Sequence, residues 1–239
     1  AQEAAPAKMT LTLDNRDGRF SPRNPTSPWY GILGRNTRIR ASLPGPSRLV
    51  LPEHATGSVS TPDSPALSVT GDLDVRLDID PDNWRIDGDL IGKADGANAD
   101  VSWGLYTRAS GELEFWWSPD GTTLHGANSV FLVTPGKARF AVRVTLDVDN
   151  GDGGHTVKFY TAPTIDGPWL QLGPEVVGAG TTSIHDGTAP VEIGRTPGFT
   201  YSGRSGAVYA AQIRDGIDGT IVASPDFTTV LWYQTSPTL

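Results

Sequence analysis

The fold is decided by the stretch Asp72-Leu73-Asp74-Val75-Arg76-Leu77-Asp78-Ile79-Asp80 of this 239-residue chain. Apolar and charged residues alternate along it without a break, so an extended backbone places all the apolar side chains on one face. Such alternation is typical of an antiparallel sheet that has one face on the core and the other in water. Arg76 lies between Asp74 and Asp78 on the charged face, where it relieves the repulsion between the two carboxylates. We therefore expect a strand with a solvated polar face.

A second strand and a hairpin continue this pattern. Residues 137–148 alternate in the same way. They are followed by Asp149-Asn150-Gly151-Asp152-Gly153-Gly154, which combines the residue types that tolerate the positive φ of a hairpin turn. Residues 155–161 form the expected return strand, with Val157 and Phe159 facing inward.

Short strands separated by turns account for the rest of this region, and helical periodicity is almost absent. Further strands are expected at residues 101–107, 111–118, 122–133, 169–172, 191–194, 206–214 and 220–223. Trp103, Trp117 and Trp169 are expected in the core. The pattern predicts an all-β protein, a two-sheet antiparallel jelly-roll sandwich.

Composition excludes several classes of partner. The formal net charge of −8 argues against a nucleic-acid partner, because phosphate binding requires a basic surface. The chain has no cysteine, so it has neither a disulfide nor a thiolate metal site. It has no apolar run of the roughly 18 residues that a membrane span requires.

The first part of the chain differs from the rest. We expect a sandwich over residues 67–239, a Pro-rich linker over 46–66 and an N-terminal β/loop segment over 1–45, which is too small to bury a core alone. This segment mixes arginines and aromatic residues, the types that anchor protein interfaces. The candidate assembly residues are Arg16, Arg19, Phe20, Trp29, Tyr30 and Arg35. We therefore expect a docking segment and a homo-oligomer.

Two stretches resemble known families. Leu11-Thr12-Leu13-Asp14-Asn15-Arg16-Asp17-Gly18-Arg19-Phe20-Ser21-Pro22, with Trp29-Tyr30-Gly31 and Gly34-Arg35-Asn36-Thr37 after it, resembles a segment of minor tail proteins from phages and prophages of actinobacteria. Residues 67–235 resemble the laminin-G-like, concanavalin-type jelly roll through the 72–80 strand, the 118–121 turn, the 147–161 hairpin and residues 165–169 and 206–216. The resemblance implies a virion or extracellular location and other tail subunits as partners.

The candidate binding residues lie near the strand at residues 111–118. Trp116 points outward there beside Glu112 and Glu114, and an indole next to carboxylates is typical of a sugar-binding platform. Trp84 could join this platform if the sheets bring it near. The alternative is that Trp116 packs under a loop or in a subunit contact.

Catalysis and metal binding have weaker support. Laminarinase-like members of the concanavalin-type fold carry Glu-x-Asp-x-x-Glu on one strand, whereas the stretch that begins at Glu112 has Trp117 in place of the third acid. We therefore expect no enzyme. Laminin-G-like domains sometimes bind calcium through loop carboxylates, which makes Asp149 and Asp152 weak candidates, although a hairpin alone explains both; we expect no cofactor.

These observations favour a non-enzymatic virion structural component whose sandwich contacts a host-surface polysaccharide and whose N-terminal arm docks into an assembly. A free-standing carbohydrate-binding lectin module is the alternative, and a glycoside hydrolase is a further one.

Overall fold

The computed structural model describes residues 15–32, 47–51, 57–131, 133, 139–199 and 205–228. The chain divides into two compact units, residues 1–45 and 46–239, and each is considered by itself. The described part of the chain contains strands and two single-turn 3₁₀ helices, Pro65–Leu67 and Gly96–Asn98. None of its helices is long and apolar enough to cross a membrane.

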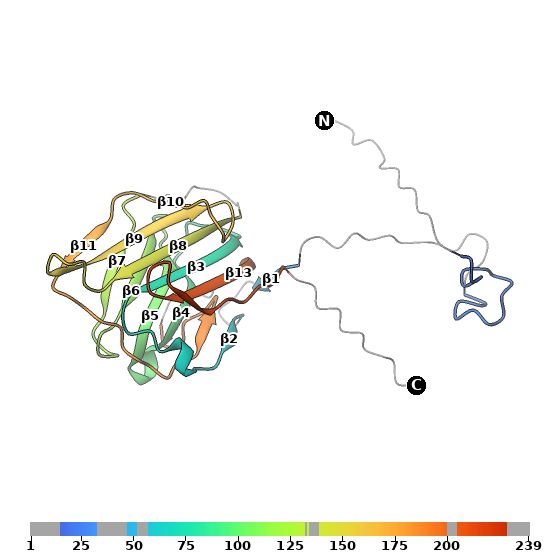
Figure 1. The fold of residues 1–239 in the computed structure, drawn as a ribbon, viewed down its shortest axis with the longest axis horizontal. Coiled ribbons are helices and arrows are strands. Elements are labelled where there is room, and N and C mark those ends of the chain that lie inside the picture. The colour runs from blue at the N-terminus through green and yellow to red at the C-terminus, as the bar shows by residue number, and fades with distance from the viewer. Residues whose placement is uncertain are drawn as a thin grey trace, which may run out of the picture. The chain divides into compact units, whose positions relative to one another are not determined.

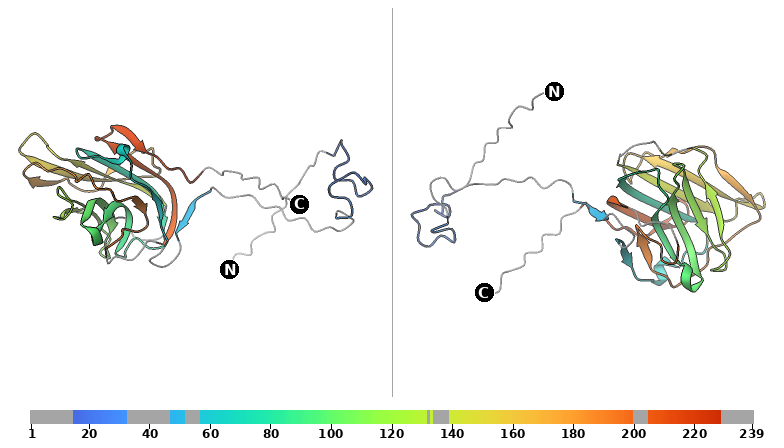
Figure 2. Two further views of the ribbon diagram at one scale, coloured as in Figure 1. Left: turned by 90° about the horizontal axis from the view of Figure 1, so that it is seen from below. Right: turned by 180° about the vertical axis from the view of Figure 1, so that it is seen from behind.

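The second unit is a sandwich of two antiparallel sheets, as predicted (Figures 1 and 2). The eight-stranded sheet is called sheet A, and its main strand order is β1-β13-β3-β8-β9-β10. Two further strands lie outside this order: β11 pairs with β9, and β14 pairs with β13. Its strands are β1 (Leu49–Leu51), β3 (Leu73–Pro81), β8 (Phe140–Asp147), β9 (Gly154–Ala162), β10 (Leu170–Gln171), β11 (Val176–Ala179), β13 (Gly206–Asp215) and β14 (Thr220–Ala223).

Sheet B has six strands in the order β2-β12-β4-β5-β6-β7. Its strands are β2 (Val59–Thr61), β4 (Gly88–Asp95), β5 (Asp100–Thr107), β6 (Leu113–Trp117), β7 (His125–Asn128) and β12 (Val191–Ile193). Residues 46–66 were expected to be a linker, but β1 pairs with β13 and β2 with β12, so they contribute an edge strand to each sheet. The expected strand at 122–133 is shorter, since only His125–Asn128 pairs with β6.

The alternation in β3 builds the core. Val75 and Leu77 are fully buried and pair with Val144 and Val142 of β8. Phe115 of sheet B belongs to the same core cluster. Each fully buried side chain of this size contributes about 1.5–3 kcal/mol relative to its exposed state, so the apolar face of β3 is a main source of stability.

The predicted hairpin between β8 and β9 is confirmed. The amide of Asn150 donates to the Gly154 carbonyl at 3.0 Å, and the Asn150 side-chain oxygen accepts from the Asp152 amide at 3.0 Å. Gly151 and Gly153 have φ of 80° and 75°, values that favour glycine. Glycine and asparagine therefore hold the turn as the sequence indicates.

The described part of the first unit is a succession of tight turns. Amides of Gly18, Ser21, Asn24, Ser27 and Tyr30 each donate to the carbonyl three residues earlier, at 3.0–3.1 Å. Side chains add further bonds, among them one from the Asn24 amide group to the Gly18 carbonyl at 3.1 Å. The turns satisfy the backbone locally without a sheet.

Gly104 of β5 gives a test of the packing on sheet B. A Cβ atom there would lie 2.3 Å from Cζ2 of Trp116. We expect Gly104→Ala to lower the free energy of unfolding by about 1–3 kcal/mol, because Trp116 must move. Gly71→Ala is the matched control, since a Cβ at Gly71 has nothing within 4 Å. Urea unfolding that gives the two variants equal midpoints would contradict this packing.

Candidate functional site

The charged face of β3 is buried, contrary to the solvated face expected from the sequence. Asp74 is 0% exposed and Arg76 6% exposed, although both lie on the face of sheet A that points away from sheet B. Arg143 of β8 pairs directly with Arg76 and is also buried. We call this surface the outer face of sheet A. Two loops cover it, one carrying Trp169 and the other carrying Asp218.

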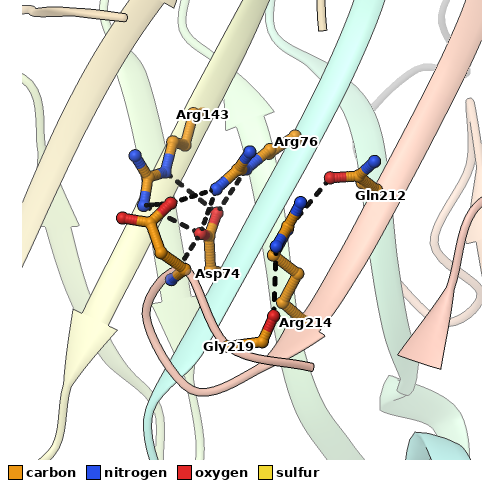
Figure 3. Close-up of polar contacts among 7 residues, drawn as sticks. Asp74, Arg76, Arg143, Gln212, Arg214 and Gly219 are labelled. Carbon is orange, nitrogen blue, oxygen red and sulfur yellow. Dashed lines mark hydrogen bonds and ion pairs between the residues drawn. The ribbon is translucent and has the colours of Figure 1, made fainter. Parts of the chain in front are cut away.

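Asp74 bridges the two arginines. Its carboxylate accepts from Nε and Nη2 of Arg76 at 3.1 and 2.8 Å, and from Nε and Nη2 of Arg143 at 3.0 and 2.8 Å. Figure 3 shows Asp74 between the two guanidinium groups. Two like charges in directly opposed positions repel each other. Asp74 offsets this repulsion with two bidentate, charge-assisted contacts.

Asp218 supplies a second carboxylate from the turn between β13 and β14. Its Oδ1 atom lies 3.0 Å from Nη2 of Arg143 and also accepts from Nη2 of Arg76. The Asp218 amide donates to Asp74 at 3.1 Å. Partial burial opposes ionisation, yet hydrogen bonds and charge from Arg143 and then Arg76 hold the pKa of Asp218 below its usual value. The two carboxylates together neutralise the two arginines.

Further contacts fix the turn that carries Asp218. Arg214 donates from Nε to the Gln212 side chain and from Nη1 to the Gly219 carbonyl, both at 3.0 Å (Figure 3). Gln212 pairs with Arg76 and Arg214 with Asp74 across β13 and β3. The turn is therefore anchored to β13, which pairs with the strand that carries Arg76.

Aromatic rings flank the arginine pair. The Arg76 guanidinium carbon lies 5.6 Å from the centre of the Trp169 ring, and that of Arg143 lies 4.9 Å from the Tyr160 ring. These distances are in the cation–π range. Trp169 was expected in the core, but it is half-buried on the outer face, where it covers the guanidiniums instead of packing between the sheets.

A second arginine–aromatic pair lies on the same face. Arg139 makes a bidentate contact with Asp78, with both distances 2.9 Å, and its guanidinium carbon lies 3.6 Å from the Tyr209 ring centre. Hydrogen-bond donors and aromatic rings thus occur together along sheet A. Such an arrangement can bind hydroxyl or carboxylate groups while a ring provides a flat apolar contact.

The expected platform at Trp116 is on sheet B, and it is covered. Trp116 and Glu114 point away from the core, as predicted, but Trp116 is only 5% exposed because Phe199 stacks on it at 4.9 Å. The expectation of an exposed indole is therefore wrong, and the alternative of packing under a loop is right. Glu114 pairs with Arg108 at 3.2 Å, and Glu112 accepts from the Ser110 hydroxyl at 3.0 Å.

Trp84 does not join this platform. It is fully buried in the core, where it stacks on Phe140 at 4.4 Å. The structure therefore brings Trp116 and Glu114 to one face, leaves Glu112 in a turn before the strand and separates Trp84 from all three.

Asp89 is a buried acid on the same side of sheet B as Trp116. It pairs with Tyr106 across β4 and β5, and its Oδ2 atom accepts from the Thr196 amide at 3.0 Å. Burial raises the pKa of Asp89 to about 7, and the hydrogen bond from Thr196 opposes that rise. With no exposed surface, Asp89 cannot reach a substrate.

The candidate assembly residues lie in the first unit, except that Arg35 is outside the described residues. Trp29 and Tyr30 are 44% and 55% exposed, Arg16 and Arg19 are exposed, and Phe20 is half-buried. The rings of Trp29 and Tyr30 therefore present aromatic surface to solvent.

The calcium candidates act in the hairpin. Asp149 accepts from the Gly151 amide at 3.2 Å, and the Asp152 amide donates to Asn150. Over the described ranges, no three His, Cys, Asp or Glu side chains gather as metal ligands would.

Sequence reasoning missed Asp218 and the position of Trp169. The available signal was the pair of outward arginines, Arg76 and Arg143, on strands expected to lie in one sheet, because adjacent buried arginines require carboxylates. Nothing in the local pattern indicates which distant residue supplies the second one.

Comparison with known proteins shows the fold. No protein-family model matches the chain, and no curated protein matches its sequence. The sialidase CBM40 of Ruminococcus gnavus bound to α2,3-sialyllactose is similar with a TM-score of 0.51 and 12% identity, over 72% of this chain and 91% of that one. This similarity confirms the two-sheet jelly-roll sandwich.

Two other similar structures have lower scores. Domains LG4–5 of the mouse laminin α1 chain give a TM-score of 0.47 and 16% identity, over 74% of this chain and 45% of that one. The enzymatically active domain of tailspike protein 2 from bacteriophage CBA120 gives 0.41 and 9%, over 78% and 32%.

The arginine–carboxylate cluster can be tested through stability. Asp74→Ala leaves two buried guanidiniums without their shared acceptor, so we expect it to lower the free energy of unfolding by about 3–5 kcal/mol. The exposed hairpin residue Asp152 gives the control, because Asp152→Ala should change that energy by less than about 0.5 kcal/mol. Chemical denaturation measures both, and equal losses would refute the role of Asp74.

Asp89 predicts a pH dependence of stability. Since its folded pKa of about 7 lies above the unfolded value of 3.8, the folded chain binds the proton more tightly. Its contribution is fully present below about pH 4 and is lost at about 1.4 kcal/mol per pH unit as the pH rises toward 7. Asp89→Asn should remove this slope. If urea unfolding from pH 4 to 8 gives parallel profiles for variant and wild type, the prediction fails.

Proposed function

We propose that this chain is a non-enzymatic, glycan-binding β-sandwich of a phage tail-like particle, and that the outer face of sheet A is its binding site. The observation that carries the proposal is the arrangement of Arg76 and Arg143 beside Trp169 and Tyr160. Rings provide flat apolar surface for the C–H faces of a sugar, and guanidiniums donate hydrogen bonds to its oxygens.

Rigidity of the site also supports binding. Asp74 fixes both guanidiniums before any ligand arrives, so less side-chain entropy is lost on binding. The fold adds support of a more general kind: the similar R. gnavus module binds sialyllactose, although one fold hosts many functions.

The proposed role of the first unit is docking to other tail subunits. Trp29, Tyr30 and Ile32 expose 44%, 55% and 64% of their surfaces in a segment whose turns are held by local hydrogen bonds. Aromatic residues next to arginine are the usual anchors of an interface. This docking would place the chain in a homo-oligomer on a virion, or otherwise in an extracellular particle.

The proposal that the chain is no enzyme has its own support. Glu114 is held by Arg108, Trp116 is covered by Phe199, and the acid with the raised pKa, Asp89, is fully buried. Turnover of a β-glucan that disappears in Glu114→Gln would overturn this part. No cofactor is proposed, so binding should persist in EDTA.

A glycan array tests the binding function. We expect the wild-type chain to bind at least one glycan, and Trp169→Ala to weaken that binding at least tenfold through the lost ring contact. Trp29→Ala is the matched control, because it removes an exposed indole from the first unit and should leave glycan binding unchanged. Equal binding by the Trp169 variant and wild type would reject the outer face of sheet A as the site.

A further inference from the structure

We propose that the Asp218 carboxylate occupies the binding position of a carboxylate carried by an acidic sugar, so that Asp218 competes with the ligand. This position, beside the guanidiniums of Arg76 and Arg143, is called the seat. This inference rests on the proposed glycan site and adds the ligand class and a built-in competitor. It follows from charge, from the hydrogen bonds of the two arginines and from the unequal burial of the two aspartates.

The charge of the seat requires an anion. Arg76 and Arg143 bring two positive charges to directly opposed positions of β3 and β8, and Asp74 neutralises one. One positive charge therefore remains when Asp218 is away. Because the arginines are buried, this charge is poorly screened and favours another carboxylate.

The two carboxylates are not equivalent. Asp74 lies inside a central strand with a side chain 0% exposed, whereas the Asp218 side chain is 66% exposed on a turn. Asp74 is thus a permanent part of the seat, and Asp218 can leave it by rotating its side chain into solvent.

The seat offers more donors than Asp218 uses. A single oxygen of Asp218 accepts from Nη2 of Arg76 and lies 3.0 Å from Nη2 of Arg143. Within the described part of the chain, Nη1 of neither arginine has a hydrogen bond. A ligand carboxylate that brings both oxygens could use these donors, and arginine recognises that planar group through paired hydrogen bonds.

The rings indicate what carries the ligand carboxylate. Trp169 lies near both guanidiniums, with its ring centre 5.6 Å from the Arg76 carbon and 6.0 Å from that of Arg143. A carboxylate attached to a sugar ring would enter beside this indole. The chemistry that fits is a uronic or similar sugar acid rather than a neutral hexose.

The experiment compares sodium glucuronate with glucose, which has the same ring without the carboxylate. Binding to the full chain is followed by tryptophan fluorescence. Asp218→Asn should raise the affinity for glucuronate about tenfold and leave that for glucose unchanged, because the competitor loses its charge. Asp215→Asn is the matched control, since it removes the same charge from the exposed last residue of β13, directly before the turn.

Equal affinities for glucuronate in wild type and both variants would overturn the inference, and so would an equal gain for glucose. If neutral glycans bind and Trp169→Ala abolishes that binding, while Asp218→Asn leaves the glucuronate affinity unchanged, the proposed function stands and this inference is refuted. Conversely, tighter glucuronate binding by Asp218→Asn supports the seat even if the glycan array shows no binding to wild type.

If a variant fails to fold, a measurement on the wild-type chain tests the same proposal. At glucuronate concentrations that saturate the fluorescence change, the ¹³C resonance of the Asp218 carboxylate should move to the position of a free aspartate. A resonance that stays in place at saturation would refute displacement.

Discussion

Asp74 has no exposed surface, yet it accepts hydrogen bonds from two arginines and from the backbone of a distant turn. A carboxylate can be buried in this way only when its charge is compensated, and here the compensation connects β3, β8 and the β13–β14 turn. The two loops that cover the outer face of sheet A meet at this cluster. The apolar face of β3 stabilises the sandwich, and its charged face organises the surface above it.

The two outer faces of the sandwich use tryptophan differently. On sheet B, Trp116 lies between Gly104 and Phe199, so the chain itself covers both of its faces. On sheet A, Trp169 is half-buried beside guanidiniums, and the carboxylate that reaches them from Asp218 is mostly exposed. The sheet B face is covered around Trp116, whereas the sheet A face combines arginine donors, aromatic rings and the mostly exposed carboxylate of Asp218. This contrast is the reason for proposing the site on sheet A.

The strands and the hairpin could be predicted because their signals are local. Alternation identified the inward residues of β3, and asparagine with glycine identified the turn at 149–154. The strand β4 was missed because Gly88, Gly92 and Lys93 interrupt any alternation. The site was missed for another reason: Asp218 contacts Arg76 and Asp74 across 142 and 144 residues, and no periodic pattern spans such a distance. The burial of Trp116 depends in the same way on Phe199, which follows it by more than eighty positions.

The central claim is that a glycan contacts the outer face of sheet A. The most direct measurement is a ¹⁵N NMR titration that follows the indole Nε1–H groups of the tryptophans and the Nε–H groups of the arginines as glycan is added. The account predicts that Trp169, Arg76 and Arg143 shift together while Trp116 stays unchanged. Shifts confined to Trp116, or to residues of sheet B alone, would contradict it.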